Sequence, residues 1–580
     1  MRKKQAGDSV EMGTGPAMRF GITMQRTIGQ FTELGRCPKK RGSATTLGRL
    51  RELGAGCILI LVAALPRGMA EDIIVIRPPS WHAAIERWAE YRSAQGYSIA
   101  YVDASHSAEA ARQQILELVQ RRGQPAFIVI MGDAAPTVPD GPYQPTFYRP
   151  STALVQFGGD RTIATDVPFA DFDGDEIPDA AVGRIVADSA EELQAYLDRV
   201  LAFESSPDFS PWRRDVHVVA GVGGFGMVAD TVIETTTRQF LAHRIPGWCR
   251  LTMTHASPSS KYCPNPERFC QCSLDSLNAG GAFWVYIGHG HVRTLDWIRA
   301  GQRVLPILTK EHLAEVDCPR PPIAVFLACY TGAFDATEDA LAERLVLQPG
   351  GTIAAIAATR VSGPYGLAVL SDGLLRAVYE KRLPTLGQIV LDAKRAMLDE
   401  GGAQEEPPSD RLRWISAIAA AMSPEGYDLR AERQEHVWQM HLLGDPLLRL
   451  RFPDEIRLET SGRAEPGKIV QVRGTVPAGT MTLELAYRRS DVRRDLDSIA
   501  VDWDSYPTWE QYQERYLRAN QPVLVRDQWQ CSAGAFERDL VVPPDLAQGK
   551  YCIRAYVEGA DGFHVGYAEV SVRPAAEATE

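Results

Sequence analysis

Two apolar runs, each ending at a reactive side chain, constrain the fold of this chain most. The first run, Phe283–Gly288, is followed at once by His289, and the second, Phe326-Leu-Ala328, by Cys329. Nearly continuous apolar runs are typical of parallel strands that helices cover on both faces. Chemistry in open α/β sheets lies just beyond the carboxyl ends of such strands. We therefore predict that the imidazole and the thiol face one crevice, as a thiol nucleophile and its base must.

The segment before these runs alternates strand and helix signals. Short apolar runs at 73–76, 98–102 and 126–131 are separated by segments with helical spacing. Ser189-Ala-Glu-Glu192 is a capping box that opens another helix. Such alternation predicts a parallel sheet with helices on its faces.

From about residue 455 the apolar residues recur with period two. Four strands between Pro and Gly turns are predicted at Ile469–Gly474, Met481–Tyr487, Lys550–Tyr556 and Val565–Val572. The charged, aromatic segment Asp491–Gln521 between them is an insertion with helical character. This pattern predicts an all-β immunoglobulin-like sandwich.

The N-terminus has the pattern of an export signal. Arg49 and Arg51 precede the 11-residue apolar run Ala55–Leu65, and small residues at Gly68 and Ala70 suit a cut after Ala70. The run is short for a bilayer span, which needs about 20 apolar residues. An uncleaved anchor or a buried strand is the alternative. We expect an exported protein (periplasmic, cell-surface or extracellular) with no membrane span in the mature chain.

The net charge limits the possible binding partners, and the cysteines indicate disulfide or metal chemistry. The net charge is −11 and no basic block follows the N-terminus, so nucleic acid is excluded as a partner.

Eight cysteines follow residue 70, and in an oxidising compartment most are expected to pair. We predict that Cys531 pairs with Cys552, and that one or two disulfides staple the loop 249–272. Zinc is the alternative in that loop, although its cysteine spacing fits no common zinc finger.

An acidic loop is a candidate for calcium. Carboxylates stand at positions 1, 3, 5 and 9 of the loop, and a carbonyl is available at position 7. The predicted ligands are Asp171, Asp173, Asp175, Ile177 and Asp179. Glu176 replaces the glycine expected at position 6, and Val182 the acid at position 12. A polar Asx-rich turn is the alternative. Any bound calcium would be structural, and we expect no required cofactor.

A glycine-rich stretch follows another predicted strand. Gly221-Val-Gly223-Gly-Phe-Gly226 matches the dinucleotide-binding fingerprint. The acidic residue expected about 20 positions later is missing from Phe240–His255. A turn at the rim of the active site is therefore the favoured interpretation.

The residues around the two reactive side chains resemble the gingipain-type cysteine peptidases of the caspase and legumain clan. The resemblance is carried by the two strand ends and by three segments between about residues 72 and 452: Asp171–Arg184, Gly351–Thr359 and Leu443–Pro446. It implies a caspase-like parallel sheet sandwiched by helices in two subdomains, with Cys329 as nucleophile and His289 as base. It also implies that the backbone N–H groups of Gly290 and Cys329 form the oxyanion hole. His291 is a second imidazole two positions later, but the family His directly follows the Ile-Gly at the strand end, and that residue is His289.

The sequence departs from that family at two positions. Where the family carries a Glu that supports the catalytic His, this chain has Val222. The family also carries an Asp that receives an Arg side chain of the substrate, and the corresponding segment here, Asp230–Glu234, contains no clear match for it. A backbone carbonyl can fix a tautomer as a carboxylate does, so the orientation of His289 can come from such a group. A preference for Arg is not carried over.

The segments Asp296-Trp297 and Arg360–Tyr365, which follow sheet strands on the same side, are predicted to line substrate pockets, with Trp297, Arg360 and Tyr365 as the main candidates. Trp297 is equally consistent with a core position. Asp445, in a turn before the last strand of this part, is predicted to cap and not to catalyse.

We predict a secreted cysteine endopeptidase that acts on proteins or peptides. Alternatives are an inactive gingipain-like binding or scaffold protein, favoured by Val222, and a processing peptidase for exported proteins. The sequence indicates no oligomeric state. Four segments are expected: a signal peptide with a long lead at 1–70, an N-terminal α/β subdomain at 71–205, a catalytic caspase-like subdomain at 206–453 and the sandwich at 454–580.

Overall fold

The computed structural model describes residues 72–103, 107–134, 143–223, 244–398, 410–489, 496 and 506–573. The predicted signal segment, Gly226 of the glycine-rich stretch and the region Asp230–Glu234 lie outside these described residues. Within them, no helix is both long enough and apolar enough to cross a bilayer.

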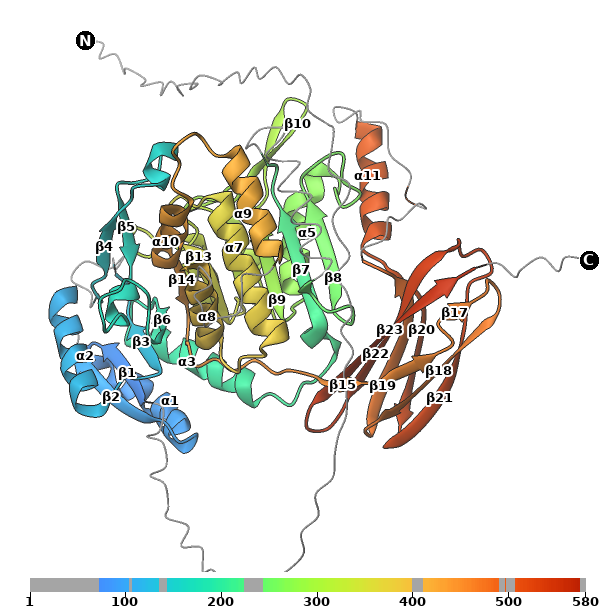
Figure 1. Ribbon diagram of the computed structural model, residues 1–580, viewed down its shortest axis with the longest axis horizontal. Coiled ribbons are helices and arrows are strands. Elements are labelled where there is room, and N and C mark those ends of the chain that lie inside the picture. Colours follow the sequence, from blue (N-terminus) through green and yellow to red (C-terminus); the bar gives the residue numbers. More distant parts are fainter. Residues whose placement is uncertain are drawn as a thin grey trace, which may run out of the picture. The chain divides into compact units, whose positions relative to one another are not determined.

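Ten strands form one central sheet in the order β2-β1-β3-β6-β14-β13-β12-β9-β7-β8 (Figure 1). The bounds are β1 Asp72–Arg77, β2 Ser98–Asp103, β3 Phe127–Met131, β6 Ala181–Ile185, β7 Asp215–Ala220, β8 Arg250–His255, β9 Phe283–Ile287, β12 Ile323–Leu327, β13 Ala354–Ala358 and β14 Met440–Leu443. β14 is parallel to β6 but antiparallel to β13. The expectation of a parallel sheet is therefore wrong at β14, because an apolar run is equally apolar in either direction and periodicity carries no strand direction.

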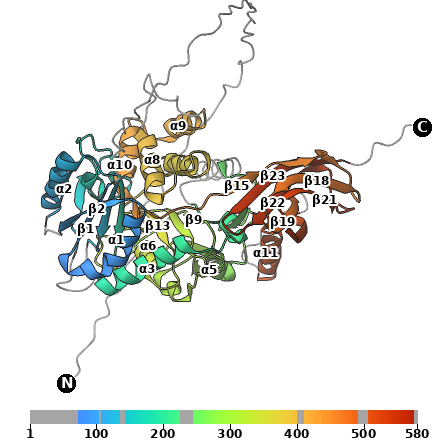
Figure 2. The same cartoon turned by 90° about the horizontal axis from the view of Figure 1, so that it is seen from below.

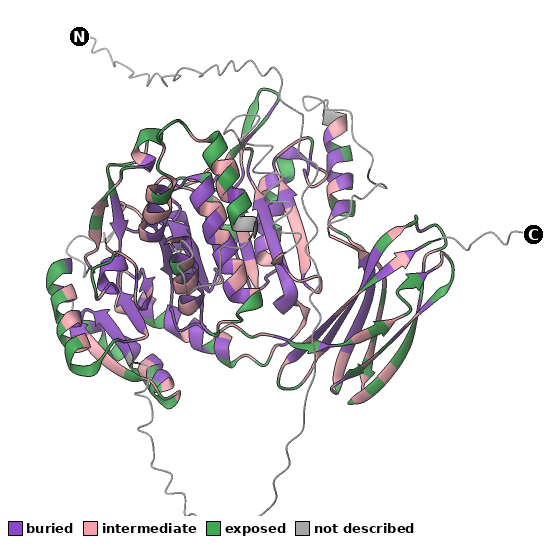
Figure 3. Ribbon diagram, viewed as in Figure 1, coloured by how far each residue is buried: buried purple, intermediate pink, exposed green. Residues whose placement is uncertain are grey.

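Helices cover both faces of this sheet. Their bounds are α1 His82–Ala94, α2 Ala108–Arg122, α3 Ala190–Ser205, α5 Phe269–Asn278, α6 Leu341–Leu347, α7 Pro364–Leu375, α8 Leu386–Leu398, α9 Asp410–Met422 and α10 Leu429–Gln439. In Figure 2, α8 and α10 lie on one side and α3 and α6 on the other. Every residue of β3, β12 and β13 is buried. Figure 3 shows that the buried residues, in purple, concentrate in the central strands. The predicted two-sided cover is confirmed.

The C-terminal part contains two sheets. One has the order β15-β23-β22-β19-β20 with β17 beside β23, and the other the order β16-β18-β21. The bounds are β15 Asp454–Ile456, β16 Leu458–Thr460, β17 Arg463–Ala464, β18 Ile469–Val476, β19 Gly479–Tyr487, β20 Val523–Cys531, β21 Gly534–Val541, β22 Gly549–Glu558 and β23 Phe563–Val572. Val472 of β18 and Leu483 of β19 belong to one buried apolar cluster, so the two sheets share a core.

The insertion in the C-terminal part contacts the central sheet. It contains the helix α11, Tyr506–Ala519. The Asn520 side chain accepts from the Met253 N–H at 2.8 Å and donates to the Met253 carbonyl at 2.9 Å, so it satisfies the backbone of the edge strand β8. An edge strand leaves such groups unpaired, and this contact covers part of that edge.

The disulfide prediction is wrong. All eight cysteines among the described residues are free thiols. Cys531 pairs with Gly479 and Cys552 with Ala486, so the two cysteines lie beside opposite ends of β19. Those positions are seven residue steps apart along an extended strand, or roughly 23 Å, which is too far for a disulfide.

Candidate active site

The register of two neighbouring strands brings the imidazole and the thiol to one edge of the sheet. β9 and β12 are parallel, and Ile287 pairs with Leu327. His289 and Cys329 each lie two residues beyond this pair. Because the strands run in the same direction, the two loops that carry these residues leave the sheet side by side.

Gly290 allows these two loops to touch. A Cβ atom on Gly290 would lie 2.7 Å from the Cys329 carbonyl oxygen and 2.9 Å from the Ala328 Cβ. Both distances are shorter than real Cβ contacts, so a larger residue would push the loops apart. The glycine after the His is therefore required by packing, whatever its N–H does in catalysis.

The His289 ring is oriented by a backbone carbonyl. Its Nε2 lies 2.8 Å from the carbonyl oxygen of Gly223. A carbonyl can only accept a hydrogen bond, so Nε2 carries the proton and the lone pair of the neutral ring is on Nδ1. Val222 is exposed and contributes its backbone N–H, which donates to Asp296 Oδ2 at 3.0 Å. His291 is also exposed, beside the Tyr330 ring.

Cys329 is a half-buried thiol that accepts a backbone hydrogen bond. The N–H of Ser362 donates to its Sγ at 3.2 Å. Burial raises the pKa of the thiol, while the N–H groups of Ser362 and of Cys329 itself oppose this rise. Tyr330, the next residue, has a φ of +56°, a left-handed conformation that is uncommon outside glycine. Such backbone outliers cluster at functional sites.

A buried histidine holds the segment that carries Ser362. The N–H of Gly363 donates to Nε2 of His436 at 3.1 Å, and Nδ1 of His436 lies 2.7 Å from the Glu432 carbonyl oxygen. Burial lowers the pKa of His436, which keeps Nε2 available as an acceptor. Sequence reasoning missed this residue, because most of the side chains that α10 buries are polar and its apolar periodicity gives no signal.

The three predicted pocket residues have different surroundings. Trp297 is 46% exposed and begins β10 (Trp297–Ala300), which pairs with β11 (Arg303–Pro306). Tyr365 is buried, and its hydroxyl lies 3.1 Å from that of Ser416. The Arg360 guanidinium donates to both carboxylate oxygens of Asp335, at 2.8 and 2.5 Å. The charge of Arg360 is thus already paired, and of the three only Trp297 is exposed.

The acidic loop has the geometry of a tight Asx turn with three convergent carboxylates. Oxygens of Asp171, Asp173 and Asp179 lie within 4.8 Å of one another, and Asp175 is not in this group. Asp175 instead accepts from the Ile177 N–H at 2.8 Å, and burial raises its pKa. Glu176 has a φ of +68°, so it adopts the conformation for which position 6 normally requires glycine.

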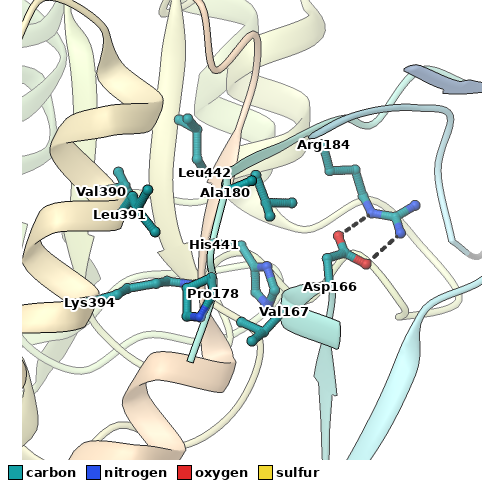
Figure 4. Close-up of a pocket in the computed structure, with 11 residues that line it drawn as sticks. Asp166, Val167, Pro178, Ala180, Arg184, Val390, Leu391, Lys394, His441 and Leu442 are labelled. Atoms are coloured by element: carbon teal, nitrogen blue, oxygen red, sulfur yellow. Dashed lines mark hydrogen bonds and ion pairs between the residues drawn. The ribbon is translucent and has the colours of Figure 1, made fainter. Parts of the chain in front are cut away.

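A cluster of buried polar side chains lies beside β14 (Figure 4). Arg184 donates to both oxygens of Asp166 at 2.7 Å, and His441 Nε2 lies 3.3 Å from the Ala164 carbonyl oxygen. Lys394 on α8 lines the same small cavity, and burial lowers its pKa to about 7. Phe334, five residues after Cys329, packs its ring on both Arg184 and His441. Through Phe334, this cluster packs against the loop that follows Cys329.

Asp445 is fully buried, and its hydrogen bonds give it a structural role. It accepts hydrogen bonds from the Trp88 indole at 2.7 Å, from Arg92 at 2.8 Å and from the Leu447 N–H at 2.8 Å.

The sequence matches a known protein family. The sequence model of peptidase family C25 matches residues 68–451. Among solved structures, the Arg-specific cysteine proteinase gingipain R superposes with a TM-score of 0.49 at 14% identity, covering 87% of this chain and 99% of that one. A complex of the pro- and mature domains of Porphyromonas gingivalis RgpB gives a TM-score of 0.47 at 14% identity, with 87% and 100% covered. No curated protein matches the sequence.

Proposed function

Because this chain belongs to peptidase family C25, the gingipain family of cysteine peptidases, we propose that it cleaves internal peptide bonds through Cys329 and His289. Family membership makes the protein a hydrolase of the cysteine-peptidase type, with a protein or peptide as substrate. The observation that carries the assignment of the two residues is the register of β9 and β12, in which each follows a paired strand position by two residues.

In the proposed reaction, the Cys329 thiol gives its proton to His289 as Sγ attacks the scissile carbonyl carbon. The oxyanion of the tetrahedral intermediate accepts hydrogen bonds from the N–H groups of Gly290 and Cys329. When the intermediate collapses, the C–N bond breaks and the leaving amine takes the proton from His289. A water molecule then gives a proton to His289 as its oxygen attacks the thioester carbon. When this second intermediate collapses, the C–S bond breaks, His289 returns the proton to Sγ, and the acid product leaves the free thiol.

The surroundings of the thiol favour general-base catalysis over a preformed ion pair. Burial raises the pKa of Cys329, so the resting thiol is mostly protonated at neutral pH. The base must then remove the proton during the attack, which makes the orientation of His289 central to the rate.

Four further features complete the proposal. The protein is exported, as its N-terminal pattern indicates. The two C-terminal sheets form an immunoglobulin-like sandwich, which their shared apolar cluster supports. The chain divides into segments 1–70, 71–205, 206–453 and 454–580. Calcium binds the loop through Asp171, Asp173 and Asp179, and the left-handed Glu176 supports this.

A second candidate function is binding without catalysis. The observation that favours it is Val222, because the gingipain resemblance leads one to expect a carboxylate there. A binding or scaffold protein would retain the fold and hydrolyse nothing. A processing peptidase for exported proteins would use the chemistry proposed above on a narrower substrate class.

A peptide library separates these candidates. The purified protein, supplied with Ca²⁺, is incubated with the library, and new termini are identified by mass spectrometry. We expect cleavage by the wild type and none by Cys329→Ala or His289→Ala. His291→Ala, which alters an exposed imidazole two residues from the base, is the matched control and should cleave as the wild type does. Absence of cleavage by the wild type, or equal cleavage by Cys329→Ala, would overturn the proposal.

A further inference from the structure

We propose that Asp296 is a positioning residue for His289 that acts through the backbone of the turn Gly221–Gly223. This inference rests on the proposed function, since it concerns how the base is held. Asp296 would thus replace the supporting acid that the family carries at the position of Val222. It lies 74 positions after Val222, outside the segment where the sequence departs from the family pattern.

The carboxylate of Asp296 connects to the His289 ring in two steps. Its Oδ2 accepts from the Val222 N–H at 3.0 Å, and the carbonyl of the next residue, Gly223, lies 2.8 Å from His289 Nε2. Its other oxygen, Oδ1, accepts from the Trp297 N–H at 3.0 Å. Both oxygens are thus used, and the direction in which the carboxylate points is fixed.

The turn needs an anchor of this kind. Gly221 and Gly223 flank Val222, and Gly223 has a φ of +80°. Glycine has more conformational freedom than any other residue, so such a turn does not by itself fix the direction of the Gly223 carbonyl. The hydrogen bond to the Val222 N–H fixes the Gly221–Val222 peptide, two peptide units before the Gly223 carbonyl, and so limits the positions that this carbonyl can take.

Tyr286 closes the network from the other side. Its buried hydroxyl donates to the His289 carbonyl at 2.8 Å and accepts from the Asp296 N–H at 3.2 Å. A Cβ atom on Gly221 would lie 2.8 Å from Asp296 Oδ2 and 2.9 Å from the Tyr286 hydroxyl, so glycine is required where the three meet. The backbone of His289 and the acceptor of its ring are both tied to Asp296.

This arrangement has a chemical consequence for the base. The Gly223 carbonyl keeps the proton on Nε2, and therefore presents Nδ1 as the nitrogen that takes the thiol proton. When the ring becomes an imidazolium, its Nε2–H bond strengthens toward the Gly223 carbonyl, which lies two peptide units after the peptide that the Asp296 carboxylate holds. Loss of Asp296 should therefore lower kcat and leave KM almost unchanged, because both oxygens of its carboxylate are already bound to backbone N–H groups of the chain.

The test compares Asp296→Ala, Asp296→Asn and the wild type on the best substrate from the peptide library. We expect Asp296→Ala to lower kcat about 10–100-fold with KM changed less than about threefold, by analogy with other groups that orient a catalytic side chain. Asp296→Asn keeps one oxygen acceptor and should recover part of that loss. Glu311→Ala, which removes an exposed acid paired with Arg293, is the control and should retain wild-type kcat.

A double variant separates positioning from a general structural role. If Asp296 acts through the ring, Asp296→Ala slows labelling of Cys329 by a peptidyl acyloxymethyl ketone in the wild-type background and slows it no further in a His289→Ala background, where labelling continues although cleavage does not. Equal fold-losses in both backgrounds, or a wild-type kcat for Asp296→Ala, would overturn the inference. Should Asp296→Ala fail to fold, the decision passes to Asp296→Asn, for which a wild-type or an undetectable kcat overturns the inference. A wild type that cleaves nothing refutes the proposed function itself, which is a different result from an active wild type indifferent to Asp296.

Discussion

The backbone N–H of Ser362 donates a hydrogen bond to Sγ of Cys329 at 3.2 Å. The two residues come from neighbouring strand ends, since β12 precedes Cys329 and β13 precedes Ser362. The thiol is therefore held between the loop of the proposed base and a backbone donor, while burial acts against its ionisation.

The first prediction concerns the pH dependence of alkylation at Cys329. Burial raises the pKa of the thiol, and the thiolate is the species that reacts. The rate of carboxamidomethylation by iodoacetamide should therefore rise with pH to a midpoint above the value of about 8.5 for a free cysteine. Mass spectrometry of the Cys329 peptide measures this rate.

Two other thiols in the same chain serve as controls for that experiment. Burial raises the pKa of Cys249 and of Cys318 to about 12, so both should react more slowly than Cys329 at every pH below 10. A Cys329 rate that is already maximal at pH 6 would indicate a preformed thiolate and contradict the expectation.

The second prediction concerns Lys394 in the cavity beside β14. Burial lowers the pKa of its ammonium group to about 7, from about 10.4 in an unfolded chain. A depressed folded pKa means that stability is fully present above about pH 10 and is lost as the pH falls toward 7. Lys394→Met should remove this loss and raise the stability at pH 7 by on the order of 2–4 kcal/mol.

Thermal unfolding of the Lys394→Met variant and the wild type at pH 7 and pH 9.5 checks this. The difference in apparent Tm between the two proteins should be larger at pH 7. A variant less stable than the wild type at pH 7 would show that the amine has a role that its surroundings do not reveal.

The third prediction concerns Glu484 in β19. Three guanidinium groups surround its fully buried carboxylate: Arg214 at 3.2 Å, Arg526 at 2.9 Å and Arg554 at 3.0 Å. Arg214 and Arg554 are themselves buried, so Glu484→Gln leaves two buried cations without the carboxylate that they share. The cost should be about 3–5 kcal/mol, measured as a fall in apparent Tm.

Glu537→Gln is the matched control for that variant. Glu537 pairs with Arg473 at 2.9 Å, but both side chains are more than half exposed. Its removal should change stability by less than about 0.5 kcal/mol. Equal effects of the two Gln variants would refute the role of burial in this argument.

The fourth prediction concerns removal of calcium from the acidic loop. If the loop binds the ion as proposed, EGTA lowers the apparent Tm and added Ca²⁺ restores it, because a ligand that binds only the folded state stabilises it. Asp173→Ala should abolish the response, while Asp454→Ala, which alters an exposed acid in β15, should not. A wild-type Tm that is insensitive to both reagents argues for the Asx-turn alternative.

Local patterns predicted a large part of the central sheet. The runs that became β9 and β12 are apolar throughout, and the reactive residue follows each run at once, so both strand ends could be read directly. The capping box at Ser189 was equally local, and its hydroxyl accepts from the Glu192 N–H at 3.1 Å. These features depend on residues within a few positions of one another.

The features that the sequence did not reveal depend on distant residues. Val222 meets Asp296 across 74 positions, and Gly363 meets His436 across 73. Periodicity within either segment does not say which loops meet. For the same reason a disulfide was expected between Cys531 and Cys552 from their place in the predicted C-terminal strands, although the register places them beside opposite ends of β19.

The most direct test of the account is the covalent adduct formed with a peptidyl acyloxymethyl ketone. Such a probe reacts with a thiol that a neighbouring base activates, and its peptide portion is chosen from the cleavage sites found in the library. We expect one adduct per chain, on Cys329, which is lost in Cys329→Ala and forms much more slowly in His289→Ala. An adduct on another cysteine, or equal labelling of wild type and Cys329→Ala, would contradict it.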